Sequence, residues 1–263
     1  MRIALGLEYD GAAFCGWQTQ PGGCGVQDHL QGALSQFAAA PIAVTAAGRT
    51  DTGVHAASQV VHFDTLAERE TASWVRGTNA YLPATARVLW AAEVAPDFHA
   101  RYSARARTYR YLLVNSPVAP ALLHARAGWY HRPLDVDRMA EAAATLLGVH
   151  DFSAFRDAQC QAKSPEREMT RAQVARKDGL VVFTFRANAF LHHMVRNLVG
   201  ALVYVGAGKQ PPSWIPELMA ARDRRNAAPT FAPDGLYLAA IAYDPAFSLP
   251  RFPAHPLLGE VEP

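Results

Sequence analysis

A single carboxylate, Asp51, lies in the short polar stretch Gly48-Arg49-Thr50-Asp51-Thr52-Gly53. The flanking segments, 42–46 and 58–63, are rich in the small, β-branched and aromatic residues typical of strands. Loops between strands often carry working residues, because the strands hold them in place. An ordinary Asx-type turn would have the same residue types. The case for chemistry therefore depends on the neighbours of Asp51, which include Arg49 and His55.

The segment 190–205 is strongly apolar and predicts a buried helix. Four polar residues interrupt it: His192, His193, Arg196 and Asn197. A buried arginine needs a carboxylate partner, and Asp51 would be that partner if the two halves of the chain close on each other. Such a pair would keep Asp51 ionised, which suits a nucleophile better than a general acid. A purely structural ion pair is the alternative interpretation.

Arginines and tyrosines alternate between residues 101 and 111, at Arg101, Tyr102, Arg105, Arg107, Tyr109, Arg110 and Tyr111. Strand periodicity sends Tyr109 and Tyr111 to one face and Arg110 to the other. Cations beside aromatic rings can hold phosphates and stack a base. A core strand with tyrosines inside and arginines at its ends fits the spacing equally well.

Two other chemistries are disfavoured. His192 and His193 are adjacent, so on a helix they would point about 100° apart, and no H-E-x-x-H motif is present. We therefore expect no metal site.

Asp51-Thr52-Gly53 also matches the Asp-Thr-Gly of aspartic proteases. That mechanism needs two carboxylates sharing a proton, the chain has no second such motif, and Arg49 would disfavour the protonated form.

Composition limits the number of domains, the class of protein and the compartment that we expect. The 263 residues suffice for one large or two ordinary domains, and 18% are charged, as in globular proteins. Of 25 cations, 25 − 3 = 22 are arginine, which suits phosphate contact but also arises from a GC-rich genome. Three cysteines without a C-x-x-C pair argue against a disulfide scaffold and a four-thiolate zinc site. With neither a signal peptide nor an apolar run long enough to span a membrane, we expect a cytoplasmic protein.

The periodicities predict the order β-α-β-β-α-β twice, which is the order of the ferredoxin-like unit. In the first copy, strands at 3–9, 42–46, 58–63 and 87–94 alternate with helices at 26–37 and 71–82. In the second, strands at 105–114, 169–175, 180–187 and 235–243 alternate with helices beginning at Leu134 and Phe190, and a further short helix covers 213–222. Gly148 is expected to close the first of these helices, and Ser213 to cap the short one.

This order predicts an α+β fold of two ferredoxin-like (RRM-like) halves. Their antiparallel sheets would meet around a central active-site cleft. We expect an N-terminal domain at 1–103 carrying the Asp51 loop, a C-terminal domain at 104–245, and a proline-rich tail at 246–263.

Several motifs together resemble the tRNA pseudouridine synthase A family. Gly48-Arg49-Thr50-Asp51-Thr52-Gly53-Val54-His55-Ala56 is similar to the family's signature, and further matches cover nearly the whole chain. They are Phe98-His99-Ala100-Arg101, Tyr109-Arg110-Tyr111, Asp151-Phe152-Ser153-Ala154-Phe155-Arg156, the run from Asn188 to Asn197, and Gly235-Leu236-Tyr237-Leu238.

The resemblance implies an enzyme that isomerises uridine to pseudouridine on the 3′ side of the tRNA anticodon arm. Asp51 matches the family's nucleophile, and Arg196 the arginine paired with it. Tyr109 matches the residue that stacks on the target uracil and helps remove its C5 proton. Arg49 matches a residue that assists base flipping, which costs a few kcal/mol. Leu236 matches an apolar residue packed against the flipped base, and His55 is placed in the substrate-binding set.

The resemblance further implies a homodimer that binds one tRNA across both subunits and needs no cofactor and no metal. Arginines spread over a surface agree with recognition of structured RNA by shape and phosphate contact. The alternative from another class is a non-catalytic RNA-binding protein with the same two halves. No residue in the motifs favours it.

Overall fold

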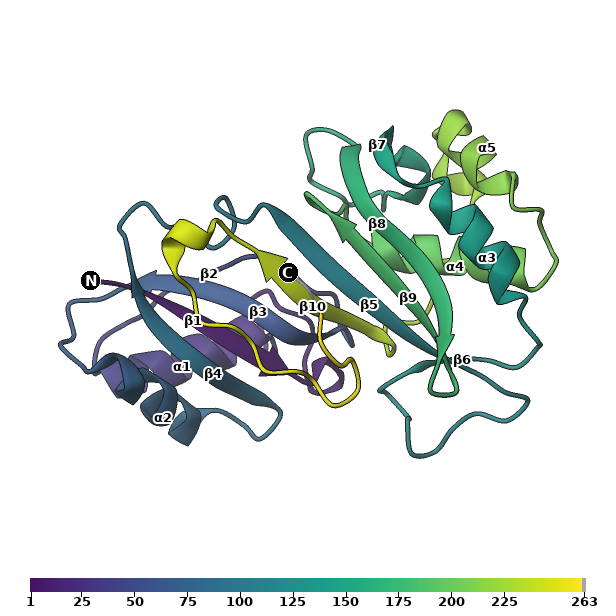
Figure 1. Ribbon diagram of the computed structural model, residues 1–263. Helices are drawn as coiled ribbons and strands as arrows, with labels where there is room; N and C mark the ends of the chain where they lie inside the picture. The colour runs from purple at the N-terminus through teal and green to yellow at the C-terminus, as the bar shows by residue number, and fades with distance from the viewer. Residues whose placement is uncertain (262–263) are drawn as a thin grey trace. The chain divides into compact units, whose positions relative to one another are not determined.

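The computed structural model describes residues 1–261 and shows a mixed α+β protein. The chain forms two compact units (Figure 1). Unit 1 contains Met1–Ala106 and the chain from Tyr237 onward, and unit 2 contains Arg107–Leu236. By packing, most of the last strand and the proline-rich tail therefore belong with the N-terminal part of the chain, although sequence order grouped that strand with the C-terminal part.

Unit 1 is built on a central antiparallel sheet in the order β4-β1-β3. At one end of β3, β2 pairs antiparallel with it, and at the other end β10 pairs parallel. The elements are β1 (Arg2–Tyr9), η1 (Gly11–Ala13), α1 (Val26–Ala38), β2 (Thr45–Ala46), β3 (His55–Asp64), α2 (Thr71–Tyr81), β4 (Ala86–Val94), β10 (Leu236–Ala242) and η4 (Pro245–Phe247).

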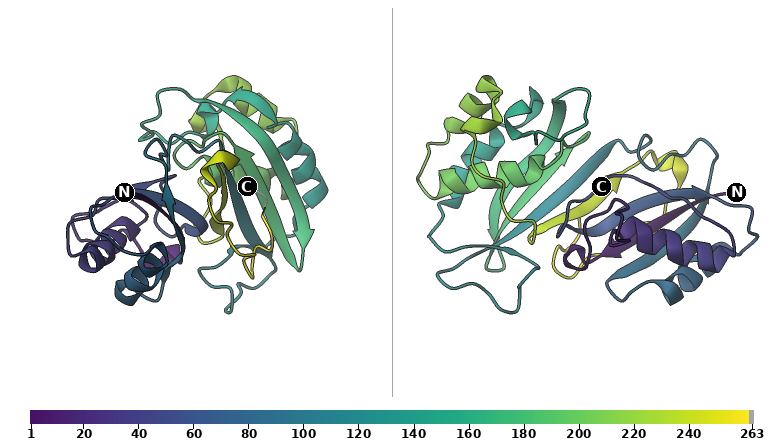
Figure 2. Two further views of the ribbon diagram at one scale, coloured as in Figure 1. Left: turned by 60° about the vertical axis from the view of Figure 1, so that its left-hand side comes forward. Right: turned by 180° about the vertical axis from the view of Figure 1, so that it is seen from behind.

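Helices α1 and α2 lie on one face of this sheet (Figure 2). Trp74 of α2 is fully buried and lies edge-on between two phenylalanines, with ring centroids 5.2 Å from Phe37 and 5.1 Å from Phe63. The core strand β1 alternates less than the sequence predicts, since five consecutive residues from Ile3 to Leu7 are buried. Consecutive burial means that side chains cover both faces of β1, and the ring of Trp90 packs directly over Gly6.

Unit 2 has an antiparallel sheet in the order β5-β9-β8-β7, and β6 pairs parallel with β5. The elements are β5 (Ala106–Asn115), β6 (Gly128–Tyr130), α3 (Val136–Ala144), β7 (Gly148–Asp151), η2 (Ser153–Phe155), β8 (Glu166–Lys177), β9 (Leu180–Ala187), α4 (Met194–Gly206), α5 (Trp214–Ala221) and η3 (Arg224–Asn226). Helices α3, α4 and α5 gather on one face of the sheet (Figures 1 and 2).

The predicted β8–β9 hairpin is confirmed. Asp178 and Gly179 occupy its turn with φ of 51° and 82°, as a tight hairpin turn requires. The apolar helix is also confirmed as a core element, because 11 of the 13 residues of α4 are buried. Only Arg196 and Tyr204 are not.

Several predicted boundaries are wrong. Helix α4 begins at Met194 rather than Phe190, because the carbonyl of His192 accepts the backbone N–H of Asp157 and is not available to a helix. Gly148 does not close α3, which ends at Ala144. Instead Gly148 opens β7 with φ of 103°, a conformation that favours glycine. Ser213 occupies the N-cap of α5 without a side-chain hydrogen bond. The strand expected at 42–46 shrinks to Thr45–Ala46.

Cys15 and Cys24 form a disulfide, with Cα atoms 5.4 Å apart. The odd cysteine count argued against a disulfide scaffold, and this single bond corrects that expectation for one pair. The bond closes a loop that the Cys15 N–H also ties to the Cys24 carbonyl at 2.9 Å. Cys160 is a free cysteine in unit 2.

Among residues 1–261, no helix has both the length and the apolar character needed to cross a bilayer.

Reducing the disulfide should destabilise unit 1. A bond between residues nine positions apart restricts the unfolded chain enough to contribute about 2–3 kcal/mol. Urea denaturation of the oxidised protein, with and without dithiothreitol, measures the difference. The Cys15→Ser/Cys24→Ser double variant should match the reduced protein and be insensitive to dithiothreitol. Equal stability of the oxidised and reduced proteins would show that the bond does not stabilise the fold.

Candidate active site

The predicted chemistry begins with Asp51, on the loop Ala47–Val54 between β2 and β3, as expected. The Ala47 N–H donates to the Val60 carbonyl at 2.8 Å where the loop leaves the sheet. The Val54 N–H donates to the Asp51 carbonyl at 3.1 Å, which closes a turn whose third residue, Gly53, has φ of 80°. Asp51 is partly exposed and Arg49 is exposed. Both side chains are therefore presented on a loop with a defined backbone.

A buried polar cluster made of Tyr9, Thr50 and Gln59 holds this loop. Gln59 is fully buried in β3 and donates from Nε2 to the Gly48 carbonyl at 2.7 Å and to the Tyr9 hydroxyl at 3.4 Å. The Tyr9 hydroxyl lies 2.8 Å from Thr50 Oγ1. Burial raises the pKa of Tyr9 to about 12, so at neutral pH the phenol keeps its proton and can donate to Thr50. Gly48 and Thr50, which precede Asp51 in the loop, are thus held by buried side chains of β1 and β3.

The loop that carries the disulfide supports the same backbone from another side. The Trp17 N–H donates to the Thr50 carbonyl at 2.9 Å. Gly16, with φ of 90°, passes so close that a Cβ there would lie 2.9 Å from the Thr50 carbonyl oxygen. A side chain at this position would push the two loops apart.

His55, predicted to bind substrate, is only 2% exposed. Its ring stacks on Tyr237 with centroids 4.6 Å apart. Its Nδ1 accepts the Gly11 N–H at 3.1 Å and lies 3.2 Å from a carboxylate oxygen of Asp10. The described contacts of His55 therefore link the start of β3 to η1 and β10.

The other predicted site residues belong to unit 2. Tyr109 is nearly buried on β5, opposite Phe185 of β9, and meets Phe190 edge-on at 5.0 Å. Arg196 is in the first turn of α4, and its Nε donates to the Phe231 carbonyl at 2.9 Å. Leu236, 4% exposed, begins β10, and its N–H donates to the Pro233 carbonyl at 2.8 Å.

The segment 229–235 is closely packed within unit 2. Tyr111 donates its hydroxyl to the Ala232 carbonyl at 2.9 Å and contacts Phe231 edge-on at 5.7 Å. Burial is the main cause that raises the pKa of Tyr111. The negative charge of Asp234 raises this pKa further, and the positive charge of Arg196 lowers it. The segment that precedes Leu236 is therefore held by both β5 and the start of α4.

His192 and His193 precede α4 instead of lying on it, which overturns the expectation that they point about 100° apart. Their rings stack at 3.9 Å, and both Nδ1 atoms face Asp157, at 3.4 Å and 2.8 Å. Burial alone would raise the pKa of Asp157. Hydrogen bonds from the Gln159 N–H and His193, together with the two histidines' charges, lower it below its usual value. His193 adopts φ of 59°, which turns the chain into the helix.

A column of three rings lies in unit 1 beside the Arg/Tyr-rich segment. His62 of β3 lies 4.8 Å from His99, and His99 stacks on Tyr102 at 4.3 Å. The Ala100 N–H donates to His62 Nδ1 at 3.1 Å. Burial lowers the pKa of His62 to about 4, with smaller contributions from His99 and Arg2, while Asp64 opposes them.

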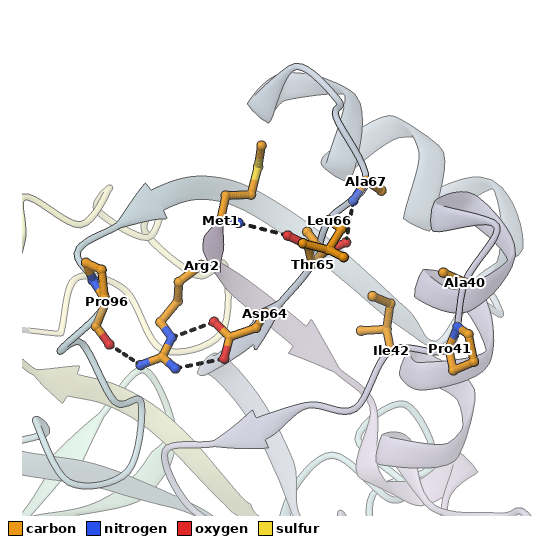
Figure 3. Close-up of a pocket in the computed structure, with 10 residues that line it drawn as sticks. All are labelled: Met1, Arg2, Ala40, Pro41, Ile42, Asp64, Thr65, Leu66, Ala67 and Pro96. Atoms are coloured by element: carbon orange, nitrogen blue, oxygen red, sulfur yellow. Dashed lines mark hydrogen bonds and ion pairs between the residues drawn. The ribbon is translucent and has the colours of Figure 1, made fainter.

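A cavity of about 520 Å³ lies in unit 1 near the N-terminus, at the end of β3 away from the Asp51 loop, and holds none of the predicted site residues (Figure 3). Arg2 makes two bonds of 2.8 Å to the Asp64 carboxylate and also binds the Pro96 carbonyl. The N-terminal amine donates to the Thr65 carbonyl at 2.8 Å. The remaining lining is mostly apolar, so these polar groups satisfy one another.

Comparison with known proteins is decisive for the family. A family model described as tRNA pseudouridine synthase matches residues 7–103 and 142–244. The chain belongs to this family. It is 60% identical over 250 residues to tRNA pseudouridine synthase A of Methylobacillus flagellatus, covering 95% of this chain and 96% of that one. It is 58% identical to the proteins of the same name from Herminiimonas arsenicoxydans and Thiobacillus denitrificans, covering 95% of this chain and 92% and 96% of theirs.

Sequence reasoning missed Gln59 and Tyr9, which hold the signature loop, and Asp157, which contacts His192 and His193. Gln59 had a detectable signal, because it is a long polar residue in the middle of a strand that otherwise reads as buried. Tyr9 had none, since a tyrosine at the end of an alternating strand is ordinary. Asp157 also had none, because its role depends on a chain reversal before α4 that the apolar pattern hides.

Gln59→Leu should destabilise the protein by about 1–3 kcal/mol, because the Gly48 carbonyl would lose its buried donor. It should also lower catalytic rate, since the loop of Asp51 would lose one of its anchors. Urea denaturation and a tRNA modification assay measure the two effects. Gln36→Leu, on the exposed side of α1, is the matched control and should change stability by less than about 0.5 kcal/mol. A Gln59→Leu protein as stable and active as the unchanged one would contradict the anchoring role.

His62 should make the stability depend on pH below 6.5. The lowered pKa in the folded state means that the unfolded chain binds the proton more tightly. Stability is therefore fully present above about 6.5 and is lost as the pH falls toward 4. Between pH 6.5 and 5 this loss should reach about 2 kcal/mol, and His62→Gln, which keeps an acceptor for Ala100, should remove it. If the free energy of unfolding fell equally with pH in the unchanged protein and in His62→Gln, this assignment would be contradicted.

Proposed function

We propose that this protein isomerises uridine to pseudouridine in the anticodon arm of tRNA, on its 3′ side, with Asp51 as the nucleophile. The observation that carries the proposal is the Asp51 loop itself. It has the family signature, it leaves the carboxylate partly exposed, and a buried cluster of side chains holds its backbone. A nucleophile must be both accessible and fixed in direction.

In the proposed reaction, Asp51 attacks the uridine at carbon 6 of the uracil or at the anomeric carbon of the ribose. The glycosidic bond breaks, the base turns, and it rejoins the ribose through carbon 5. The bond between Asp51 and the nucleotide breaks, which frees the carboxylate. The proton on carbon 5 then leaves and nitrogen 1 gains one, so the product is an isomer of the substrate. The reaction exchanges one bond for another within a nucleotide, so it needs no net oxidation or reduction and no cofactor or metal enters the proposal.

Tyr109 and Arg196 are proposed to act on the same uridine as Asp51. Tyr109 would stack on the uracil and help remove its C5 proton. Its ring is already oriented by the edge-on contact with Phe190. Arg196 would pair with the Asp51 carboxylate and keep it ionised. The Nε bond to the Phe231 carbonyl fixes one edge of its guanidinium, which supports a directed ion pair.

Arg49, Leu236 and His55 complete the proposed substrate-binding set. Arg49 is exposed beside Asp51 and would occupy the space that the flipped base leaves in the RNA stack. Leu236 would pack against the flipped base. His55 would contribute chiefly by holding the loop, because its ring is almost entirely buried.

At the level of architecture, we propose that the N-terminal and C-terminal parts of the chain each form a ferredoxin-like half. In unit 1, the order β4-β1-β3 with β2 beside β3 supports this assignment. The domain limits 1–103, 104–245 and 246–263 and the active-site cleft between the halves are parts of the same proposal. A homodimer acting on one tRNA, in the cytoplasm, completes it. The rival, a non-catalytic RNA-binding protein, would bind tRNA and leave uridine unchanged.

Asp51→Asn should reduce turnover by about a thousandfold or more, because the amide is nearly isosteric but not nucleophilic. Affinity for tRNA should stay within severalfold. The measurement is pseudouridine mapping on unmodified tRNA incubated with purified protein, without added metal or nucleotide. Asp137→Asn, at an exposed site on α3, is the control and should react at the unchanged rate.

The outcomes separate the hypotheses. New pseudouridine in the anticodon arm, absent with Asp51→Asn, supports reaction, substrate and nucleophile together. Pseudouridine formed by Asp51→Asn would refute the assignment of the nucleophile. Binding of tRNA without any pseudouridine from the unchanged protein would favour the non-catalytic rival.

A further inference from the structure

The ring of Tyr102 is unusual because it is exposed and yet held in place. It is 76% exposed, more than any other tyrosine described as exposed. Its position in unit 1 lies just before β5, in the short turn that follows Phe98. An exposed aromatic ring normally keeps its rotamer freedom, since ordering a side chain costs conformational entropy. Here several contacts restrict the ring.

The restriction comes first from stacking. His99 lies face to face with Tyr102, with centroids 4.3 Å apart and planes inclined by 30°. Behind His99 lies His62, which is only 6% exposed. The guanidinium of Arg101 lies 5.6 Å from the centroid of the Tyr102 ring. The column therefore runs from the buried sheet to solvent, with Tyr102 as its outer member and a cation beside it.

Backbone hydrogen bonds fix the turn as well. His99 Nδ1 accepts the N–H groups of both Arg101 and Tyr102 at 3.2 Å. The Ser103 N–H donates to the His99 carbonyl at 2.8 Å, and the His99 N–H donates to Ser103 Oγ at 3.0 Å. The Tyr243 hydroxyl donates to the Ala100 carbonyl at 2.6 Å. Every residue of the turn from His99 to Ser103 thus takes part in at least one of these bonds.

We propose that Tyr102 is a stacking platform for an unpaired base of the substrate tRNA. RNA loops are recognised largely through unstacked bases that lie on aromatic rings or arginine planes. A ring fixed in advance binds a base without a further ordering cost. The neighbouring guanidinium of Arg101 can attract the RNA backbone or extend the stack. The inference rests on the proposed function, from which the substrate class comes.

The chain offers a matched comparison. Tyr81, at the C-terminal end of α2, is also exposed, at 53%. Among the ring contacts of residues 1–261, none involves Tyr81. If exposure alone made a tyrosine bind RNA, both residues would matter. If a ring must be held in place by the column to bind RNA, only Tyr102 would contribute to binding.

The test measures tRNA affinity and single-turnover pseudouridine formation for four proteins: unchanged, Tyr102→Ala, Tyr102→Phe and Tyr81→Ala. Tyr102→Ala should weaken binding about tenfold, which is typical of one lost base stack. Its rate at saturating protein should stay within about twofold of the unchanged rate. Tyr102→Phe, which keeps the ring, and Tyr81→Ala should bind like the unchanged protein. The dependence of affinity on salt should keep its slope, since no charge is removed.

A photo-reactive benzoylphenylalanine at position 102 gives a direct readout, because it should crosslink to loop nucleotides of the tRNA. Undiminished affinity in Tyr102→Ala would overturn the platform, as would an equal loss in Tyr102→Phe. A change in sedimentation of Tyr102→Ala, without tRNA, would assign the ring to a protein–protein contact and also overturn it. Failure of the proposed function is separately visible, since the unchanged protein would then form no pseudouridine whatever its affinity.

Discussion

The structure of unit 1 depends on satisfying the backbone of a loop that cannot join the sheet. Once the chain leaves β2 at Ala46, the carbonyls of Gly48 and Thr50 have no strand partner. Buried polar groups without partners are costly. Gln59 and Trp17 supply the missing donors from β3 and from the disulfide-closed loop. The tip of the loop can then carry Asp51 at the surface while the base of the loop has the order of a core.

Unit 2 shows a second case, in which a charged side chain lies at the end of a helix that disfavours its charge. Arg196 lies in the first turn of α4, and this turn contains no acidic residue. The N-terminal end of a helix carries partial positive charge, so a cation there is unfavourable by up to about 1 kcal/mol. The bond from Arg196 Nε to the Phe231 carbonyl offsets part of this cost. Local conflicts of this kind are found at functional sites, which agrees with the role proposed for Arg196.

Most of the elements could be predicted because their apolar periods are strong. The hairpin at Asp178-Gly179 follows directly from turn chemistry, and the buried helix α4 follows from its hydrophobicity. The errors share a different cause. The start of α4 depends on the His192 carbonyl pairing with Asp157, which is 35 residues away in sequence, and the Cys15–Cys24 bond depends on the path of a loop. The apolar pattern of the sequence carries no information about either contact.

The site shows the same division between local and distant information. Asp51, Arg49 and His55 could be selected from sequence because they share one short motif, whereas Tyr9 and Gln59 are separated by 50 positions and meet only in the folded sheet. Even within the motif, residue type did not predict burial, since Arg49 is exposed and His55 is almost fully buried. A motif therefore selects candidate residues, but which of them can contact a substrate and which are buried depends on the direction in which each side chain points.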